Sequence, residues 1–416
     1  MKHITIAKLS LIILCMISIL VGCSSEDAQT SIEHNIEGKL HMGYFYQEDM
    51  ITLITSEGFK ESTWDSVDFD FICQDLSCGH KADTCSAKFI AYNSLLGEEK
   101  RTGDNIFSFV YGEKRIIVDS YLNNWVMDNE EEKGIYRSYH YYKTDIYEAA
   151  IDGSNRKLIT SFDGEISSSL VSHAAVLYNG KLYFGGKIDV MTEDILDVKT
   201  NLVKSETAYV KHAFFEVDLE NYSVQVIGTD TCPVDNGYTY QVHRGDEWIY
   251  LTRMNGWTEK AEWYAVNPKT EEIVNIINLE SQAPYIIGVI DDVIYAEREN
   301  VVYRCDWLQN ETLEEFYTVD DTTVVAEVLD EQIWIATDKS FEAENNYIEY
   351  TILDNEGNKL QTNYYPEYFT FLDMIDDKVI YYRPFAEQIE WWCEKDNLST
   401  LESSICIGEY CGINEE

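Results

Sequence analysis

One short pattern recurs along this chain: four to six apolar and aromatic residues that follow a glycine or an acidic turn. Its plainest copy is DDKVIYY at residues 376–382. The copies begin near residues 38, 105, 181, 247, 292, 332 and 378. Runs of this length suit buried β-strands and are too short for a helix of useful length. The pattern therefore predicts an all-β fold with little helix.

The spacing of these copies predicts a repeat architecture. The last four are about 40 to 46 residues apart, the length of a four-stranded propeller blade. The earlier gaps are longer, so each must hold a blade with an insertion, or a blade whose first strand the pattern does not reveal. A chain of 416 residues is too long for most single cores, yet it has no Gly-, Ser- or Pro-rich linker. We expect a closed ring of seven blades, with six or eight as alternatives and a string of β-sandwiches as the competing architecture.

Four predicted hairpins support the same interpretation. They span residues 146–159, 214–227, 263–274 and 350–360, and Asp152, Asp218, Asn267 and Asp354 open their turns. An Asp or Asn there can accept a hydrogen bond from its own backbone two residues on. An aromatic inner strand followed by such a hairpin resembles a blade of TolB-like β-propellers. The resemblance covers residues 38–392 and implies a toroid of blades around a central channel.

The amino terminus predicts an export signal. An apolar run of about a dozen residues follows Lys2 and Lys8, which fits a signal-peptide core and is short for a membrane span. It ends in Leu20-Val21-Gly22-Cys23, which resembles the bacterial lipobox; an ordinary signal peptide is the alternative. We expect a signal peptide at 1–22 and a lipidated Cys23 carrying palmitate-type acyl chains. A tether would follow at 23–37 and the propeller at 38–392, with a Cys-containing tail or closing strand at 393–416.

The charge balance excludes one class of partner. The 75 acidic residues outnumber the 31 basic ones, for a formal net charge of -44. A field of that sign repels nucleic-acid phosphates, so we expect no nucleic-acid binding. A solvated acidic surface is the plain explanation, and carboxylates gathered for calcium or a cationic partner are the sharper one.

The lipid on Cys23 is expected to anchor the protein to the outer face of the bacterial cytoplasmic membrane. We expect the protein to be a monomer.

One cysteine cluster is a candidate metal site. Cys73, Cys78, His80 and Cys85 follow the pattern C-x4-C-x-H-x4-C, which resembles a segment of propeller-type lipoproteins of Gram-positive anaerobes. Three thiolates and one imidazole suit a closed tetrahedral zinc site, although the spacing matches no standard zinc finger. Eight cysteines remain after Cys15 and Cys23, and an even number in an exported protein also fits disulfides. Free or redox-active thiols are the third alternative.

Two insertions, at residues 119–144 and 188–210, are predicted as long connections at a face of the propeller. The first contains five aromatic residues that are candidates for ligand binding: Trp125, Tyr136, Tyr139, Tyr141 and Tyr142. Padding of a neighbouring blade is the alternative role for these side chains.

The sequence carries no signature of a catalytic class. It has no H-E-x-x-H, G-x-S-x-G, Walker or G-x-G-x-x-G motif. A surface binding or scaffolding module for a peptide, glycan or partner protein is therefore the leading hypothesis. The alternatives are a carbohydrate hydrolase or lyase that uses carboxylates at the channel, and a structural envelope protein.

Overall fold

In the computed structural model, all described residues belong to one compact unit, Ile36–Glu416. The predicted signal peptide, the predicted lipidation site Cys23 and most of the predicted tether lie outside the described residues. The structure describes residues 37–41, 44–55, 58–64, 69–75, 77–81, 85–88, 90–93, 98–101, 106–130, 134–166, 173–197, 202–232, 238–255, 260–279, 281–310, 312–318, 323–338, 347–365, 370–375, 377–383, 389–397 and 405–409.

The described chain is all-β, as predicted. It has no α-helix, and one 3-10 turn covers Lys395–Asn397. No helix in the described ranges is long and apolar enough to cross a membrane.

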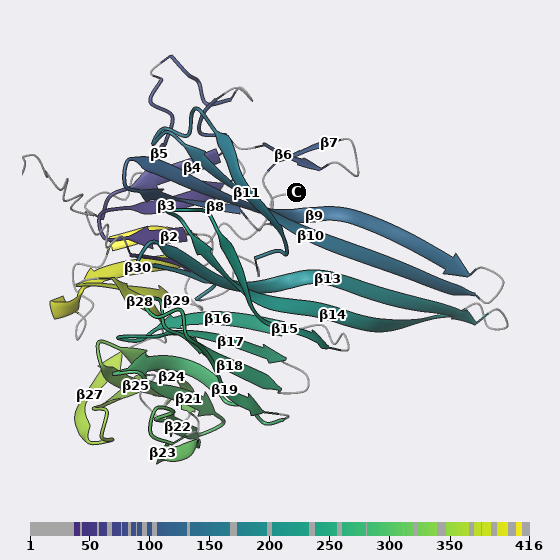
Figure 1. Ribbon diagram of the computed structural model, residues 1–416. Helices are drawn as coiled ribbons and strands as arrows, with labels where there is room; N and C mark the ends of the chain where they lie inside the picture. The colour runs from purple at the N-terminus through teal and green to yellow at the C-terminus, as the bar shows by residue number, and fades with distance from the viewer. Residues whose placement is uncertain are drawn as a thin grey trace, which may run out of the picture. The chain divides into compact units, whose positions relative to one another are not determined.

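The second half of the chain forms four separate four-stranded antiparallel sheets, each built from consecutive strands (Figure 1). The first two contain β16 (Tyr238–Arg244), β17 (Ile249–Asn255), β18 (Ala261–Val266), β19 (Ile273–Leu279), β20 (Tyr285–Ile290), β21 (Val293–Arg298), β22 (Val301–Cys305) and β23 (Glu314–Thr318). The other two contain β24 (Thr323–Leu329), β25 (Gln332–Asp338), β26 (Ile348–Leu353), β27 (Lys359–Tyr365), β28 (Thr370–Ile375), β29 (Lys378–Arg383), β30 (Ile389–Glu394) and β31 (Ile405–Glu409).

The first half forms one 13-stranded sheet and a separate hairpin of β6 (Ile90–Asn93) and β7 (Glu98–Arg101). The large sheet contains β1 (Gly38–His41), β2 (Tyr44–Gln47), β3 (Ile51–Thr55), β4 (Gly58–Ser62), β5 (Asp70–Phe71), β8 (Ile106–Tyr111), β9 (Lys114–Glu130), β10 (Ile135–Ala149), β11 (Lys157–Asp163), β12 (Ala175–Tyr178), β13 (Lys181–Asp197), β14 (Leu202–Asp218) and β15 (Val224–Cys232). Three runs of consecutive strands, β2–β5, β8–β11 and β12–β15, are joined into it because β1 pairs with both β2 and β12, and β10 pairs with β13.

The first strands of successive runs and sheets contact one another. Strand β16 contacts β12 and β13, β20 contacts β16 and β24, and β24 contacts β28. The last sheet packs against the first run, because Ile380 of β29 shares an apolar cluster with Tyr44, Tyr46 and Trp64. This closed succession of twisted sheets is the arrangement of a β-propeller.

The predicted turn-led strands are real, but five of the seven are not the inner strands that were expected. The copies near residues 38 and 105 are β1, which pairs with the first strands of two runs, and β8, which is first in its run, whereas β13, β17, β21, β25 and β29 are each second in their run. The acidic turns before two of them are two-residue hairpin loops with both φ angles positive: 49° and 60° at Asp291 and Asp292, and 51° and 59° at Asp330 and Glu331. Such turns match the twist of antiparallel strands.

The second-strand aromatics join neighbouring sheets. Tyr250 of β17 is fully buried, and its hydroxyl donates to the backbone carbonyl of Asp292 in the next sheet at 2.9 Å. The indole Nε1 of Trp307 donates to the Tyr250 oxygen at 3.1 Å. A tyrosine can therefore fill the core between two sheets and still satisfy its hydroxyl.

All four predicted hairpins are present. Backbone amides of Ser154, Glu220, Lys269 and Glu356 donate to Oδ1 of the Asp or Asn two residues earlier, at 3.0, 2.8, 3.0 and 3.0 Å. The local turn chemistry was therefore sufficient to place these elements.

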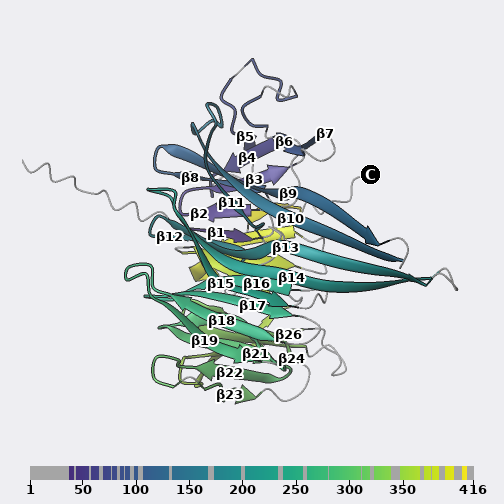
Figure 2. The same cartoon turned by 45° about the vertical axis from the view of Figure 1, so that its right-hand side comes forward.

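The predicted long connections at 119–144 and 188–210 are instead strand extensions. Strands β9, β10, β13 and β14 continue past the other strands and pair in the order β9-β10-β13-β14 (Figures 1 and 2). We call this four-stranded extension the arm; it comprises residues 124–130, 135–141, 189–197 and 202–211. The prediction of loops was wrong because cross-strand pairing, which local sequence does not reveal, extends both hairpins.

Candidate metal centre

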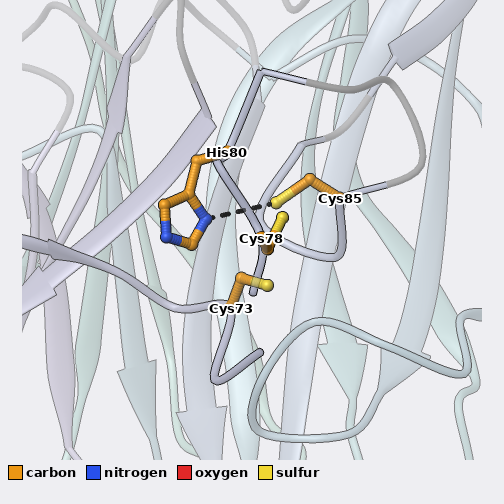
Figure 3. A group of neighbouring side chains, drawn as sticks. All are labelled: Cys73, Cys78, His80 and Cys85. Atoms are coloured by element: carbon orange, nitrogen blue, oxygen red, sulfur yellow. Dashed lines mark hydrogen bonds between the residues drawn. The ribbon is translucent and has the colours of Figure 1, made fainter. Parts of the chain in front are cut away.

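The four predicted ligands come together in one loop that follows β5. Figure 3 shows their side chains converging: the donor atoms of Cys73, Cys78, His80 and Cys85 all lie within 4.8 Å of one another. His80 Nδ1 and Cys85 Sγ lie 3.5 Å apart. A tetrahedron with metal–sulfur bonds of about 2.3 Å has edges of roughly 3.8 Å, so a small contraction would seat a zinc ion.

None of the three cysteines in the loop is disulfide-bonded. Cys85 is buried, and Cys73 and Cys78 are partly buried. The geometry therefore offers three separate sulfur donors and one nitrogen donor.

Local turns bring the donors together. Asp75 Oδ1 accepts hydrogen bonds from the backbone amide and the hydroxyl of Ser77, at 2.9 and 2.7 Å. The Cys78 amide donates to the Asp75 carbonyl at 2.9 Å, which reverses the chain between Cys73 and Cys78. This is an Asx turn closed by a backbone turn.

His80 is held in an uncommon backbone conformation. Its φ of 52° lies in the left-handed region, which a non-glycine residue rarely adopts. Its ring stacks on Phe71 with centroids 4.6 Å apart, so the aromatic contact orients the imidazole while Nδ1 faces the thiols. A fixed ring orientation is what a metal-binding histidine requires.

The surroundings act differently on the two end thiols. Hydrogen bonds from the Ser86 side chain and the Asp75 backbone lower the pKa of Cys73. Burial raises the pKa of Cys85 to about 11, although the Ala87 amide opposes it. The backbone amides of Asp75 and Ala87 thus donate to the sulfurs of Cys73 and Cys85, each two residues earlier. A buried Cys85 thiolate still needs a nearby cation.

A half-buried guanidinium supplies part of that positive charge. Arg156 donates to the carbonyl oxygens of Gly153, at 2.8 Å, and Ser86. Burial lowers the pKa of Arg156, and attraction to Cys85 works against that effect. Three thiolates with one divalent ion carry a net charge of about -1, which this guanidinium can balance.

The loop is fastened to two runs of strands. The Phe59 amide of β4 donates to the Ala87 carbonyl at 2.8 Å. Gly153, in the β10–β11 turn, approaches so closely that a Cβ there would lie 2.4 Å from the Ser86 carbonyl oxygen. Cys85 and Ala87 also share an apolar cluster with Phe59, Ile106 and Ile117. The centre therefore joins parts of the chain about 70 residues apart.

The five candidate aromatic residues do not form one site. Cross-strand pairing places Trp125 opposite His140 on one face of the sheet, and alternation along β10 adds Tyr136 and Tyr142 to that face, Tyr142 just outside the arm. Tyr139 and Tyr141 point to the other face. Trp125 and Tyr141 are exposed, and burial raises the pKa of Tyr142 to about 12.

A central cavity escaped the sequence analysis. It has a volume of about 480 Å³ and is bounded by β1 and by the first strands β16, β20, β24 and β28. Lys39, His243 and Arg244 line it, as do Glu297 and Glu327. The strands β16, β20, β24 and β28 that bound it lack the turn-led pattern, so only the closed ring reveals which side chains meet there.

A buried carboxyl pair also escaped the sequence analysis. Asp119 and Asp145 are paired across β9 and β10, and both side chains are buried. Asp145 accepts hydrogen bonds from Tyr121 and Ser161. Burial, followed by repulsion from Asp145, raises the pKa of Asp119 to about 7. Carboxylates are too abundant in this sequence for the pair to have been singled out.

Comparisons with known proteins concern the fold alone. No family model and no curated protein matches the chain. Among solved structures, TolB from Acinetobacter baumannii is 12% identical, with 61% of this chain and 74% of that chain covered and a TM-score of 0.28. The β-propeller domain of the Trilobed protease from Pyrococcus furiosus is 13% identical, with 74% and 99% covered and a TM-score of 0.29.

Longer peptidases are also similar to the chain over part of their length. Porphyromonas gingivalis dipeptidyl peptidase 4 is 9% identical, with 88% of this chain and 58% of that chain covered and a TM-score of 0.37. The chain thus spans little more than half of that peptidase. No residue role or activity is carried over from any of these proteins.

Proposed function

We propose that this protein is a membrane-anchored β-propeller that binds a peptide in its central cavity and carries a structural zinc ion in its cysteine loop. The observation that supports binding is the cavity itself, because its lining includes cationic and anionic side chains on different strands. Lys39 and Arg244 come from β1 and β16, whereas Glu297 and Glu327 come from β21 and β24. A peptide has both an ammonium and a carboxylate, so it complements such a lining better than a neutral glycan does.

Peptide binding is tested by thermal shift with a panel of short synthetic peptides. Glu297 lines the cavity, and its carboxylate would pair with the ammonium of a bound peptide, so Glu297→Gln should weaken binding by about tenfold, or 1.4 kcal/mol. Glu299→Gln is the matched control, because Glu299 is 81% exposed and is not among the lining residues. Equal affinities in both variants would contradict binding at this cavity. Turnover of a glycan panel that Glu297→Gln abolishes would instead establish the carbohydrate-active alternative.

We infer that zinc at Cys73, Cys78, His80 and Cys85 is structural. The four donors fill all four tetrahedral positions, which leaves no open position for substrate. The wild type should contain about one zinc per chain by elemental analysis, and Cys78→Ser should lose it. Cys305→Ser is the control, since Cys305 is buried in β22 and does not belong to the cysteine loop. Metal-free wild-type protein would contradict the proposal.

We also propose seven blades. The runs β2–β5, β8–β11 and β12–β15 and the four separate sheets supply seven groups of four consecutive strands. Strand β1 is then an additional strand that pairs with the first strands of two runs. A structure from cryo-electron microscopy or crystallography with six or eight blades would contradict this count.

The membrane address is proposed from the sequence. Residues 1–22 would be removed, Cys23 would carry the lipid, and residues 23–37 would tether the propeller at the outer face of the cytoplasmic membrane. A fatty-acid probe should label the wild type and leave a Cys23→Ser variant unlabelled. Equal labelling of both proteins would refute the anchor.

A further inference from the structure

The arm has a free strand edge on β9. Strand β8 pairs with β9 only as far as Asp119, and among the described strands only β10 pairs with the remainder of β9; β6 contacts β9 without pairing with it. From Asn124 to Glu130 that pairing with β10 runs without a register shift. The backbone groups of β9 that point away from β10 therefore present a regular edge that can accept another strand.

This edge differs from six of the seven outer strands. The pairings of β11, β15, β19, β23, β27 and β31 with their neighbours each contain a register shift, whereas the shift in the β9–β10 pairing lies between Leu122 and Asn124, just before the edge begins. Bulges of this kind disturb a strand edge and discourage further pairing. The Asn124–Glu130 edge has no such shift, and it contains neither proline nor lysine.

The same edge carries three exposed apolar residues. Trp125, Val126 and Met127 are 48%, 43% and 55% exposed. Three consecutive exposed apolar residues on an unprotected edge are characteristic of an interaction surface.

We propose that two copies of this chain associate by antiparallel pairing of their β9 edges, centred on Met127. The seven-residue span is complementary to itself, because Asp128 would lie opposite Val126 of the second copy, and Glu130 opposite Asn124. No two carboxylates face each other directly, which avoids the like-charge pairs that destabilise sheets. Glu130 is also neutralised within its own chain by Arg137, at 2.8 Å.

The arm also makes this association compatible with a net charge of -44. The pairing begins five residues beyond Asp119, where β8 ends its pairing, and an extended strand of that length covers roughly 16 Å. That distance exceeds the Debye length of about 8 Å at physiological ionic strength, so repulsion between the two propellers is largely screened. The sequence alone led us to expect a monomer, because it does not reveal a free edge.

The test measures the mass of the full chain by light scattering over a series of concentrations. The wild type should reach about twice the mass of one chain. Val126→Lys should weaken the dimer at least tenfold, because a lysine on the edge disfavours pairing. Val226→Lys is the matched control: Val226 is 50% exposed on the outer strand β15 and should leave the dimer intact. A wild type that stays monomeric at every concentration, or a Val126→Lys variant that dimerises like the wild type, would overturn the proposal.

A second measurement is independent of the stability of the lysine variant. In the proposed register Met127 lies opposite its own copy, with Cα atoms about 4.5 to 5.5 Å apart. Met127→Cys should therefore form an intermolecular disulfide on mild oxidation, whereas Leu158→Cys, at a site 49% exposed on β11, should not. Equal cross-linking of the two variants would reject this register.

Discussion

Asp119 shows how a single buried group can couple folding to pH. Its side chain lies opposite Asp145, which already accepts hydrogen bonds from Tyr121 and Ser161. The proton is therefore best placed on Asp119, whose pKa is raised to about 7 by burial first and by Asp145 second. The folded chain thus holds a proton that the unfolded chain releases near its ordinary pKa of 3.8.

The direction of the resulting pH dependence follows from linkage. Between the unfolded and folded pKa values the folded state binds more protons, so this group lowers stability as the pH rises from about 4 to about 7. Asp119→Asn removes that loss. The free energy of unfolding of the variant, relative to that of the wild type, should therefore rise by on the order of 1–4 kcal/mol between about pH 4 and about pH 8. Urea unfolding of both proteins measures the difference. An advantage that is the same at both pH values would contradict the assignment of the proton.

Tyr250 shows how one hydroxyl joins two sheets. It donates to the Asp292 carbonyl and accepts from Trp307, and all three groups are buried. Tyr250→Phe leaves the indole N–H of Trp307 without this acceptor, so we expect a loss of about 1–3 kcal/mol in the free energy of unfolding. Tyr285→Phe is the control, because Tyr285 is 48% exposed, and it should be neutral. Chemical denaturation that finds the two variants equally stable would argue against the inter-sheet bond.

At the scale of elements, the hairpins were predictable and the inner strands were not. Asp152 and Asp354 open turns whose chemistry is contained in a few residues, and the structure has both. Strand β12, by contrast, is the four residues Ala175–Tyr178, and its place at the centre depends on pairing with β1. The arm was missed for a related reason, because its strands are set by partners about 56 residues away, as in the Arg137–Glu193 ion pair.

The cysteine loop was likewise predictable only in part. Its four ligands lie within thirteen residues of one another, so their chemistry could be predicted from the sequence. Their support comes from Arg156 and Gly153, which contact Ser86 from a different run of strands. Spacing alone cannot reveal such support, because it arises from packing between sheets.

Gly153 provides a test of that support. Its φ is 78°, and a Cβ would lie 2.4 Å from the Ser86 carbonyl oxygen. Gly357 occupies the corresponding turn of the β26–β27 hairpin with a φ of 86°. A Cβ there would lie 3.4 Å from its nearest neighbour, the Phe316 ring. Both alanine variants carry a similar backbone strain of about 1 kcal/mol. Only Gly153→Ala should also displace the cysteine loop, and it should then release zinc to a chelator faster than Gly357→Ala does. Equal release rates would show that the contact does not support the loop.

At the scale of the whole molecule, the contact between the last sheet and the first run holds the ring closed. Trp64 is buried there, stacks on Tyr46 and donates through Nε1 to the Gln47 carbonyl at 3.0 Å. The Lys378 ammonium lies 5.8 Å from the Trp64 ring centroid, which brings the start and the end of the ring together across more than 300 residues. A string of independent sandwiches would have no such contact.

Closure predicts that damage at this one seam affects the entire ring. Trp64→Ala removes a buried indole and should lower the free energy of unfolding by about 3–5 kcal/mol. Because each sheet supplies part of its neighbours' core, proteolysis of this variant should spread to both ends of the propeller and leave no stable half. Trp125→Ala is the control, since Trp125 is 48% exposed on the arm and its loss should change the unfolding energy little. A protease-resistant fragment of the Trp64→Ala protein that keeps only the β16–β27 sheets would show that those sheets fold without a closed ring.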